Sequence, residues 1–277
     1  MDLQTLKKLL DSYSSIKDLN YYDETDSTNQ RAKDYVNSQD VPSAKLPQLF
    51  VSEIQSAGRG RLGRSWVSPP NEGIWMSYLC KPVLSPEQIP SVTLLAGLAV
   101  ARAINSFALR KSIFNLEVQI KWPNDIVINK KKICGILTEL IGSTSCIVCG
   151  IGINVNSLTF PDELSNKATS LLKETGVVWN REKLIAVIIK NLEDLIYAYE
   201  KSGDLEFILY DYNRLLVNLD NEVVINYNSD LGGASNEGTY ISRGIDKTGA
   251  LIIEDSNGNR KKVSSGEVSV RGIYGYV

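Results

Sequence analysis

The chain has 277 residues, a length that indicates one large domain or one medium domain with an appendage. Apolar residues make up 43% and charged residues 22%, which is typical of a globular protein and excludes a disordered, collagenous or coiled-coil chain. Thirty basic against thirty-two acidic residues leave a formal charge of −2, so no global field draws the molecule onto nucleic acid or an anionic membrane. Any anion site must be local.

The sequence has no histidine, which excludes a Ser-His-Asp or Cys-His mechanism and removes the commonest metal ligand. Four cysteines are too few for a disulfide scaffold. Cys146 and Cys149 have the spacing of a redox or zinc pair, but they lie in a β-like run that points them to opposite faces, so we interpret them as core residues. The first residues contain no apolar run, so we expect no secretory signal, no membrane span and a cytoplasmic protein.

The first elements alternate between helix and strand. Leucines at helical spacing between Leu3 and Leu10 predict a helix, and an extended piece follows from Leu19 to Asp23. A second, polar helix begins at Asp26 to Asn29, where the polar side chains could simply cap it. The next predicted elements are a strand from Leu49 to Glu53, a Gly/Arg loop from Gln55 to Pro70, a strand from Gly73 to Cys80 and a buried helix from Ser91 to Phe107.

The second half is dominated by short strands. Four consecutive antiparallel strands are predicted at Val118–Lys121, Asp125–Asn129, Lys132–Ile141 and Ser145–Asn154. A helix from Asn180 to Lys201 stops at Gly203. Five short strands follow, at Val223–Tyr227, Gly238–Ile245, Ala250–Glu254, Arg260–Val263 and Glu267–Arg271. We predict an α+β fold: residues 1–219 form a mixed β-sheet with helices packed mainly on one side, and residues 220–277 form a small C-terminal β-barrel.

The Gly/Arg loop is the most informative segment. Residues 58–64 read Gly-Arg-Gly-Arg-Leu-Gly-Arg, which formally matches a dinucleotide fingerprint. That fingerprint requires a helix to begin at once, and the sequence Ser-Trp-Val-Ser-Pro-Pro that follows forbids one. Glycines that let a ligand approach and three arginines suited to phosphate or carboxylate oxygens predict a site for a small anion. A solvated basic loop and an Arg/Gly contact with nucleic acid are the alternatives.

A second motif, Lys121-Trp122-Pro123-Asn124-Asp125, lies at a turn between two predicted strands. By itself it could be a mere hairpin. Lys132 begins the returning strand, so Lys132 and this turn can lie on either side of one site, and Gly135 would let a flat ligand lie against the strand.

A third motif, Gly150 to Asn156, ends a strand with small and amide residues. It is either a strand end weakened by glycine or a site where the amide of an asparagine hydrogen-bonds to the donor and acceptor groups at the edge of a base.

Taken together, these motifs resemble the biotin protein ligases. Seven segments match in the family's order, across most of the chain: residues 27–29, 55–66, 121–125, 132–137, 150–156, 168–171 and 266–271. The resemblance implies a catalytic domain at residues 1–219, a C-terminal barrel of the SH3-like type and a two-step reaction. In the first step the biotin carboxylate attacks the α-phosphate of ATP to give biotinyl-5′-AMP. In the second, a lysine of a biotin carboxyl carrier domain of a biotin-dependent carboxylase takes the biotin as an amide.

The resemblance also assigns roles to individual residues. It implies that biotin is held by Ser27, Thr28, Asn29, Gln55 and Lys132, with Gly58, Arg59 and Gly135 lining its bed. It places Arg61, Arg64, Trp66, Lys121, Asn124 and Asn154 at ATP, with Arg271 approaching from the C-terminal barrel, and it makes Asp125 a ligand for Mg²⁺. Charge repulsion between the two substrates then requires cations, which Arg61, Lys121, Lys132 and the Mg²⁺ ion supply, so the catalytic residues are Arg61, Lys121 and Lys132 together with Asp125, which holds the ion. The base for the second step is open between Asp125 and the adenylate phosphate.

Three further expectations follow from this interpretation. The loop Gly58 to Ser65 should be mobile without ligand and ordered with biotin or adenylate. Only about twenty residues precede the first strand, too few for a three-helix DNA reader, so we expect no repressor activity and no DNA partner. A lipoate ligase of the same fold is the nearest alternative, and a nucleic-acid binding module is the second, although eight acidic and six basic residues in the barrel segment disfavour it. The chain could be a monomer or a homodimer.

Overall fold

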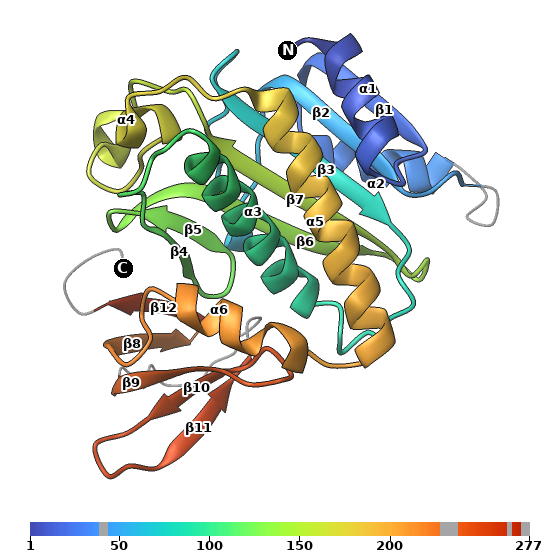
Figure 1. Cartoon of the computed structure of the whole chain (residues 1–277). Coiled ribbons are helices and arrows are strands. Elements are labelled where there is room, and N and C mark those ends of the chain that lie inside the picture. Colours follow the sequence, from blue (N-terminus) through green and yellow to red (C-terminus); the bar gives the residue numbers. More distant parts are fainter. Residues whose placement is uncertain (39–43, 228–237, 265–267, 273–277) are drawn as a thin grey trace.

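The computed structural model describes residues 1–38, 44–227, 238–264 and 268–272. Its largest element is a seven-stranded mixed sheet with the strand order β1-β2-β3-β7-β6-β5-β4 (Figure 1). The strands are β1 (Asp18–Thr25), β2 (Gln48–Gln55), β3 (Gly73–Cys80), β4 (Val118–Lys121), β5 (Asp125–Ile128), β6 (Lys131–Ile141) and β7 (Cys146–Asn154). β1 runs parallel to β2 and the other neighbours are antiparallel, so the predicted run of four consecutive antiparallel strands, β4 to β7, is confirmed.

Helices cover the two faces of this sheet unequally. The long helices pack on one face: α1 (Leu3–Tyr13), α3 (Ser91–Arg110) and α5 (Arg181–Ser202). The other face carries α2 (Thr28–Ser38), whose Ala32 and Val36 contact Phe50 and Val148 in a smaller core. Short helices connect the elements: η2 (Arg61–Gly63), η3 (Asp162–Leu164), α4 (Leu171–Thr175), η4 (Glu206–Ile208) and α6 (Leu209–Leu215). The α+β prediction with helices mainly on one side is confirmed.

The central helix α3 explains why the first face is fully closed. Most of its alanine, valine and leucine side chains are buried, and Val92, Leu95 and Ala99 are 0% exposed between the sheet and α5. Such a contiguous apolar surface drives burial. Among the described residues α3 is the one helix long and apolar enough to cross a membrane, and most of it is buried in the core.

Side chains of β7 alternate between the two faces and change character along the strand. Cys149, Ile151 and Ile153 belong to the large core under α3, and Val148 belongs to the small core under α2. Beyond Val148, the positions that continue the α2 face are Gly150 and Gly152. The sheet is therefore left without a side-chain layer of its own where α2 ends.

The C-terminal strands form an antiparallel sheet with the order β11-β10-β9-β8-β12. They are β8 (Glu222–Tyr227), β9 (Gly238–Ile245), β10 (Leu251–Glu254), β11 (Arg260–Val263) and β12 (Val268–Gly272). This unit rests on the larger one: Trp122 Nε1 donates to the carbonyl oxygen of Gly249 at 3.1 Å, and Ser91 Oγ donates to that of Thr248 at 3.2 Å. The division between residues 219 and 220 stays a prediction.

Candidate active site

Glycines on two neighbouring strands form the floor of the site. Gly135 on β6 pairs in register with Gly152 on β7, and a Cβ atom added at either residue would lie 2.8 Å from the indole of Trp66. Any larger side chain would therefore displace this indole. The sequence predicted a flat ligand against Gly135, and in the structure the flat group that lies there is Trp66.

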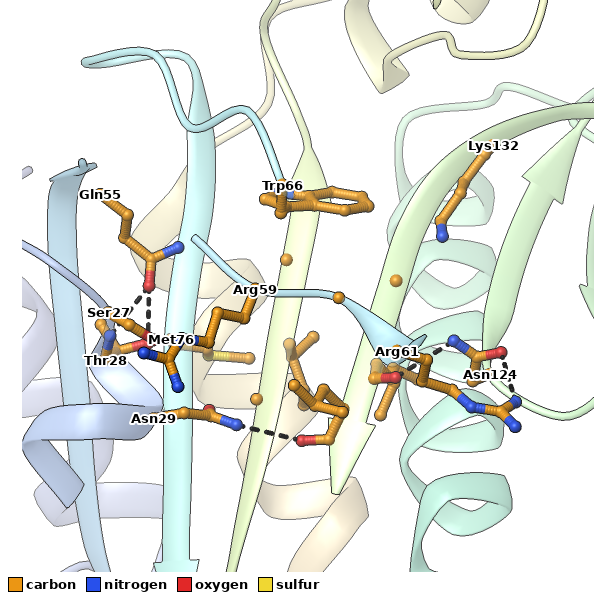
Figure 2. Close-up of a pocket in the computed structure, with 17 residues that line it drawn as sticks. Ser27, Thr28, Asn29, Gln55, Arg59, Arg61, Trp66, Met76, Asn124 and Lys132 are labelled. Atoms are coloured by element: carbon orange, nitrogen blue, oxygen red, sulfur yellow. Dashed lines mark hydrogen bonds between the residues drawn. The ribbon is translucent and has the colours of Figure 1, made fainter. Parts of the chain in front are cut away.

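Hydroxyl and amide groups close one end of this floor (Figure 2). The backbone N–H of Thr28 donates to Gln55 Oε1 at 2.9 Å, and the Thr28 hydroxyl lies 3.1 Å from the same oxygen and 2.7 Å from Ser77 Oγ. Gln55 Nε2 donates to Ser68 Oγ at 3.1 Å. The sequence left open whether the polar residues before α2 only cap the helix. The Thr28 hydroxyl in fact bonds across to β2 and β3.

The Gly/Arg loop folds back on itself above the floor. The N–H of Trp66 donates to the carbonyl of Gly58 at 2.8 Å, and the N–H of Gly60 donates to that of Arg64 at 2.7 Å. A Cβ atom at Gly58 would lie 2.5 Å from the carbonyl oxygen of Trp66, so this close approach requires glycine. Arg59 and Arg64 are exposed at the loop surface.

Arg61 differs from the other two arginines because it is half-buried. It donates through Nη1 to Asn124 Oδ1 at 3.1 Å, as Figure 2 shows. Burial lowers the pKa of its guanidinium; the Asp125 carboxylate opposes this shift and the charge of Arg64 adds to it. An arginine stays protonated in a protein at neutral pH. The loop therefore brings one positive charge into the interior of the site.

Two lysines bring further positive charge to the same place. Lys132 Nζ lies 2.7 Å from Asp125 Oδ1 and 5.1 Å from the centre of the Trp66 ring. Lys121, at the end of β4, is 7% exposed. The hairpin of β5 and β6 thus brings Lys132 to the turn at residues 121–125, as the sequence predicted. Asn154 ends β7 nearby and donates through Nδ2 to the carbonyl of Thr169 at 3.1 Å.

Two cavities meet beneath and beside Trp66. The smaller one has a volume of about 50 Å³ and reaches Ser27, Thr28 and Gln55. The larger one has a volume of about 1060 Å³ and extends over the turn at residues 121–125 toward β12. Five residues line both cavities and form their junction: Gly60, Arg61, Trp66, Asn124 and Lys132. Two compounds bound side by side would meet at these residues.

The structure gathers nearly all of the residues that the sequence singled out. The smaller cavity is lined by Ser27, Thr28, Asn29, Gln55, Arg59, Arg61, Trp66, Asn124, Lys132 and Gly135. The larger one is lined by Arg61, Arg64, Trp66, Lys121, Asn124, Asp125, Lys132 and Asn154. Gly58 supports the loop from outside both linings. The side chain of Arg271 lies outside the described residues, although its neighbour Val270 lines the larger cavity.

Sequence reasoning missed several residues of the site. Phe160, Ser157 and Lys167 line the larger cavity from the segment between β7 and α4. Ser77 is 0% exposed and bonds to Thr28 and Asn29. A lone hydroxyl within the apolar strand β3 was the available signal for it, since buried polar groups need partners.

The acidic residues around the cavities are few. Glu72 and Asp125 are the two that line the larger cavity. Within the described ranges, no cluster of three or more His, Cys, Asp or Glu side chains could hold a metal ion by itself. Any divalent cation here would need most of its ligands from a bound compound.

Known proteins share this architecture. Residues 21–154 match the biotin/lipoate A/B protein ligase family, and residues 235–271 match the biotin protein ligase C terminal domain. The bifunctional ligase/repressor BirA of Bacillus spizizenii is 34% identical over 88% of this chain and 72% of its own length. The biotin--[acetyl-CoA-carboxylase] ligase of Mycobacterium tuberculosis is 30% identical over 79% of this chain and 77% of its own. A biotin protein ligase from Aquifex aeolicus, solved in complex with biotin and ATP, superposes with a TM-score of 0.75 at 27% identity, covering 93% of this chain and all of that one.

The fold and the paired cavities therefore define a ligase of the cofactor-attachment class. More narrowly, the chain belongs to the biotin protein ligases within the biotin/lipoate A/B protein ligase family, and it carries both the catalytic domain and the C-terminal domain of that group.

Proposed function

We propose that this protein uses ATP to convert biotin into biotinyl-5′-AMP and then transfers biotin to a lysine of a biotin carboxyl carrier domain. The observation that carries the proposal is the junction of the two cavities, where Arg61 and Lys132 line both cavities together with Trp66. The relatives named as biotin ligases support the choice of substrates.

The two cavities suit two substrates of different size. Biotin would take the smaller one, with its ring system toward Thr28 and Gln55 and its carboxylate toward Lys132. At about 50 Å³ this cavity is below the roughly 300–1,000 Å³ of ordinary ligand sites, so the Gly/Arg loop must move for biotin to enter. ATP would take the larger cavity, with its base toward Phe160 and Asn154 and its phosphates toward Lys121.

The first step is a displacement at phosphorus. A carboxylate oxygen of biotin forms a bond to the α-phosphorus of ATP, the bond to the bridging oxygen breaks, and pyrophosphate leaves. Two unit charges about 4 Å apart repel by roughly 4 kcal/mol at an effective dielectric near 20, so the two anions need cations between them. Arg61, Lys121 and Lys132 supply these charges, which also stabilise charge on the equatorial phosphate oxygens. The substrate itself provides the nucleophile, so no histidine is required.

The second step joins biotin to the acceptor. The lysine amine attacks the carbonyl carbon of the mixed anhydride, AMP leaves, and the nitrogen loses a proton as the amide forms. Its ordinary pKa of about 10.4 means that this proton must be removed before or during attack. Asp125 and the adenylate phosphate are the two candidates for the base.

Mg²⁺ fits this site as an ion carried by the nucleotide. An Mg²⁺ ion of this kind is coordinated by one or two protein carboxylates, and its other ligands are phosphate oxygens and water. Asp125 would hold the ion. Its carboxylate already pairs with a positive charge, since Asp125 Oδ1 lies 2.7 Å from Lys132 Nζ. When bound, the ion would neutralise charge on the triphosphate.

Several features favour biotin over the alternative functions. The match of residues 235–271 to a biotin protein ligase C-terminal domain favours biotin over lipoate. The buried Lys121 in the lining of the larger cavity favours a small anion over a nucleic-acid strand. α1 buries Leu6 and Leu10 in the core beside α5, so α1 itself is not available as a DNA-recognition helix. Four buried free thiols support a reducing, cytoplasmic location.

Labelled biotin tests the proposal directly. Purified protein with ATP, Mg²⁺ and biotin should release pyrophosphate and label a carboxyl carrier domain, whereas lipoate in place of biotin should give neither product. Labelling with lipoate at an equal rate would assign the protein to the alternative ligase. Absence of pyrophosphate release with biotin would contradict the proposal.

A further inference from the structure

An ion pair outside the recognised motifs contacts the biotin end of the site. Glu139 on β6 accepts from Lys33 of α2 at 2.7 Å through Oε1 and from Asn29 Nδ2 at 2.9 Å through Oε2. Asn29 Nδ2 also lies 3.3 Å from the carbonyl oxygen of Leu137, the bond drawn at Asn29 in Figure 2. Both hydrogens of the Asn29 amide are therefore used within the protein.

The oxygen of the same amide is used as well. Ser77 Oγ lies 2.6 Å from Asn29 Oδ1, and since an amide oxygen can only accept, the single hydrogen of Ser77 points to Asn29. Ser77 Oγ is also 2.7 Å from the hydroxyl of Thr28. With its own hydrogen already committed, Ser77 can only accept there. The Thr28 hydroxyl could also donate to Gln55 Oε1 at 3.1 Å, but that oxygen already accepts from the Thr28 N–H, and two hydroxyl oxygens 2.7 Å apart without a hydrogen between them would repel, so Thr28 donates to Ser77.

These bonds form a one-way chain that starts at a carboxylate. Glu139 accepts from Asn29, Asn29 accepts from Ser77, and Ser77 accepts from Thr28. An ionised carboxylate can only accept, so at 2.9 Å Glu139 provides the shorter and charged of the two bonds that fix which way the Asn29 amide faces, the other being the 3.3 Å bond to the Leu137 carbonyl, and this sets the direction of every later bond. Gly150 makes room for this arrangement, because a Cβ atom there would lie 2.3 Å from Asn29 Oδ1.

The end of the chain faces the smaller cavity, which Thr28 lines. Because its hydrogen is committed to Ser77, the Thr28 hydroxyl presents lone pairs to a ligand. The ring urea of biotin carries N–H donors, which match an acceptor at this position. Reversing the chain would release the Thr28 hydrogen from Ser77, leaving it to the weaker contact with Gln55 Oε1 at 3.1 Å or to the ligand, where it would meet an N–H donor.

We propose that Glu139 is a positioning residue for biotin binding, which makes the Thr28 hydroxyl an acceptor by setting the direction of the chain Thr28-Ser77-Asn29-Glu139. Asn29 then acts through Thr28 and has no free hydrogen for the ligand. This inference rests on the proposed function and deepens it, because it states how the site selects an N–H group.

Two substitutions of similar length separate positioning from packing. Glu139→Met removes the acceptor, and we expect the calorimetric Kd for biotin to rise about tenfold, as for loss of one hydrogen bond to a charged group. The KM for ATP in pyrophosphate release should stay within about twofold, because the larger cavity is untouched. Glu139→Gln keeps a carbonyl acceptor for Asn29 while Lys33 turns to solvent, so its Kd should lie within about threefold of the wild-type value.

A double-mutant cycle gives the decisive comparison. If Glu139 acts through Asn29, adding Glu139→Met to an Asn29→Ala chain should change the Kd for biotin no further. Asp194→Ala, which removes an exposed ion pair with Lys190 on α5, is the matched control and should leave the Kd and the KM for ATP unchanged.

Additive effects of the two substitutions, or equal Kd values for the Met and Gln variants, would overturn the inference. Wild-type protein that forms no adenylate from biotin would overturn the proposed function together with it. If the wild-type protein forms adenylate but the double-mutant cycle shows no coupling between Glu139 and Asn29, the inference is overturned and the proposed function stands.

Discussion

Replacing Lys132 by methionine separates the two roles of its ammonium group. In the folded protein this group lies 2.7 Å from Asp125 Oδ1, and the two side chains are 24% and 12% exposed. Removing one partner of a fully buried pair costs about 3–5 kcal/mol, and the partial exposure here reduces the expected loss of stability to about 2 kcal/mol. For a chain of this size, that loss lowers Tm by about 4 °C.

The loss of catalysis should be larger than the loss of stability. A positive charge about 4 Å from a phosphate or carboxylate oxygen contributes roughly 4 kcal/mol at an effective dielectric near 20. Removing it should slow adenylate formation about a thousandfold, at about 1.36 kcal/mol for each factor of ten. Single-turnover release of pyrophosphate at saturating biotin and ATP measures this rate.

A second substitution separates the two effects. In the double variant Asp125→Asn/Lys132→Met, the asparagine amide that replaces the carboxylate needs no ammonium partner. Its Tm should therefore recover relative to Lys132→Met, while adenylate formation stays slow. The reasoning is refuted if Lys132→Met forms adenylate within tenfold of the wild-type rate, or if the double variant regains activity together with Tm.

Three other changes test separate parts of the structure. Gly152→Ala would place a Cβ atom 2.8 Å from Trp66 Nε1, so we expect biotin to bind about tenfold more weakly by calorimetry; unchanged binding would mean that the indole moves freely. Proteolysis within Gly58–Ser65 should slow when biotin is added, and equal rates would count against closure of the loop. Burial alone would raise the pKa of Glu53, but Arg181 and the Met1 amine outweigh it and hold the pKa at about 2. Glu53 should therefore add stability above about pH 4.5 that is lost toward pH 2, and urea unfolding of Glu53→Gln should show a flatter pH dependence there.

Local patterns in the sequence were enough to place one half of the site. Pro123 marks a tight turn, and the hairpins around it are sequential, so Lys132 had to return close to Asp125. The local pattern of the Gly/Arg loop predicted a site for a small anion, but it left a solvated loop and a nucleic-acid contact open, and the roles of its residues came from the resemblance to biotin protein ligases.

The other half depends on strand order, which sequence patterns do not give. β3 pairs with β7, so Ser77 comes to lie beside residues that follow it by more than seventy positions. Asn29 and Glu139 are 110 residues apart and meet because α2 crosses the face of β3 and β7. No periodic pattern within either segment predicts that α2 crosses these strands. Gly135 is another example. Its place in a strand predicted that a flat group would lie against it, but the sequence pattern could not predict that this group is the Trp66 indole.

The position of the site follows from how the sheet is covered. On one face, α1, α3 and α5 seal the strands with apolar side chains, and a cavity there would cost packing energy. On the other face, α2 covers only part of β3 and β7, and Gly150, Gly152 and Gly135 leave gaps in the side-chain layer of β6 and β7. A loop must close this gap, and a loop rich in glycine and arginine gains little from apolar burial and much from anions. We therefore expect its closed state to depend on the substrates it covers, so that the loop would enclose a water-labile anhydride while it exists and open once it is consumed.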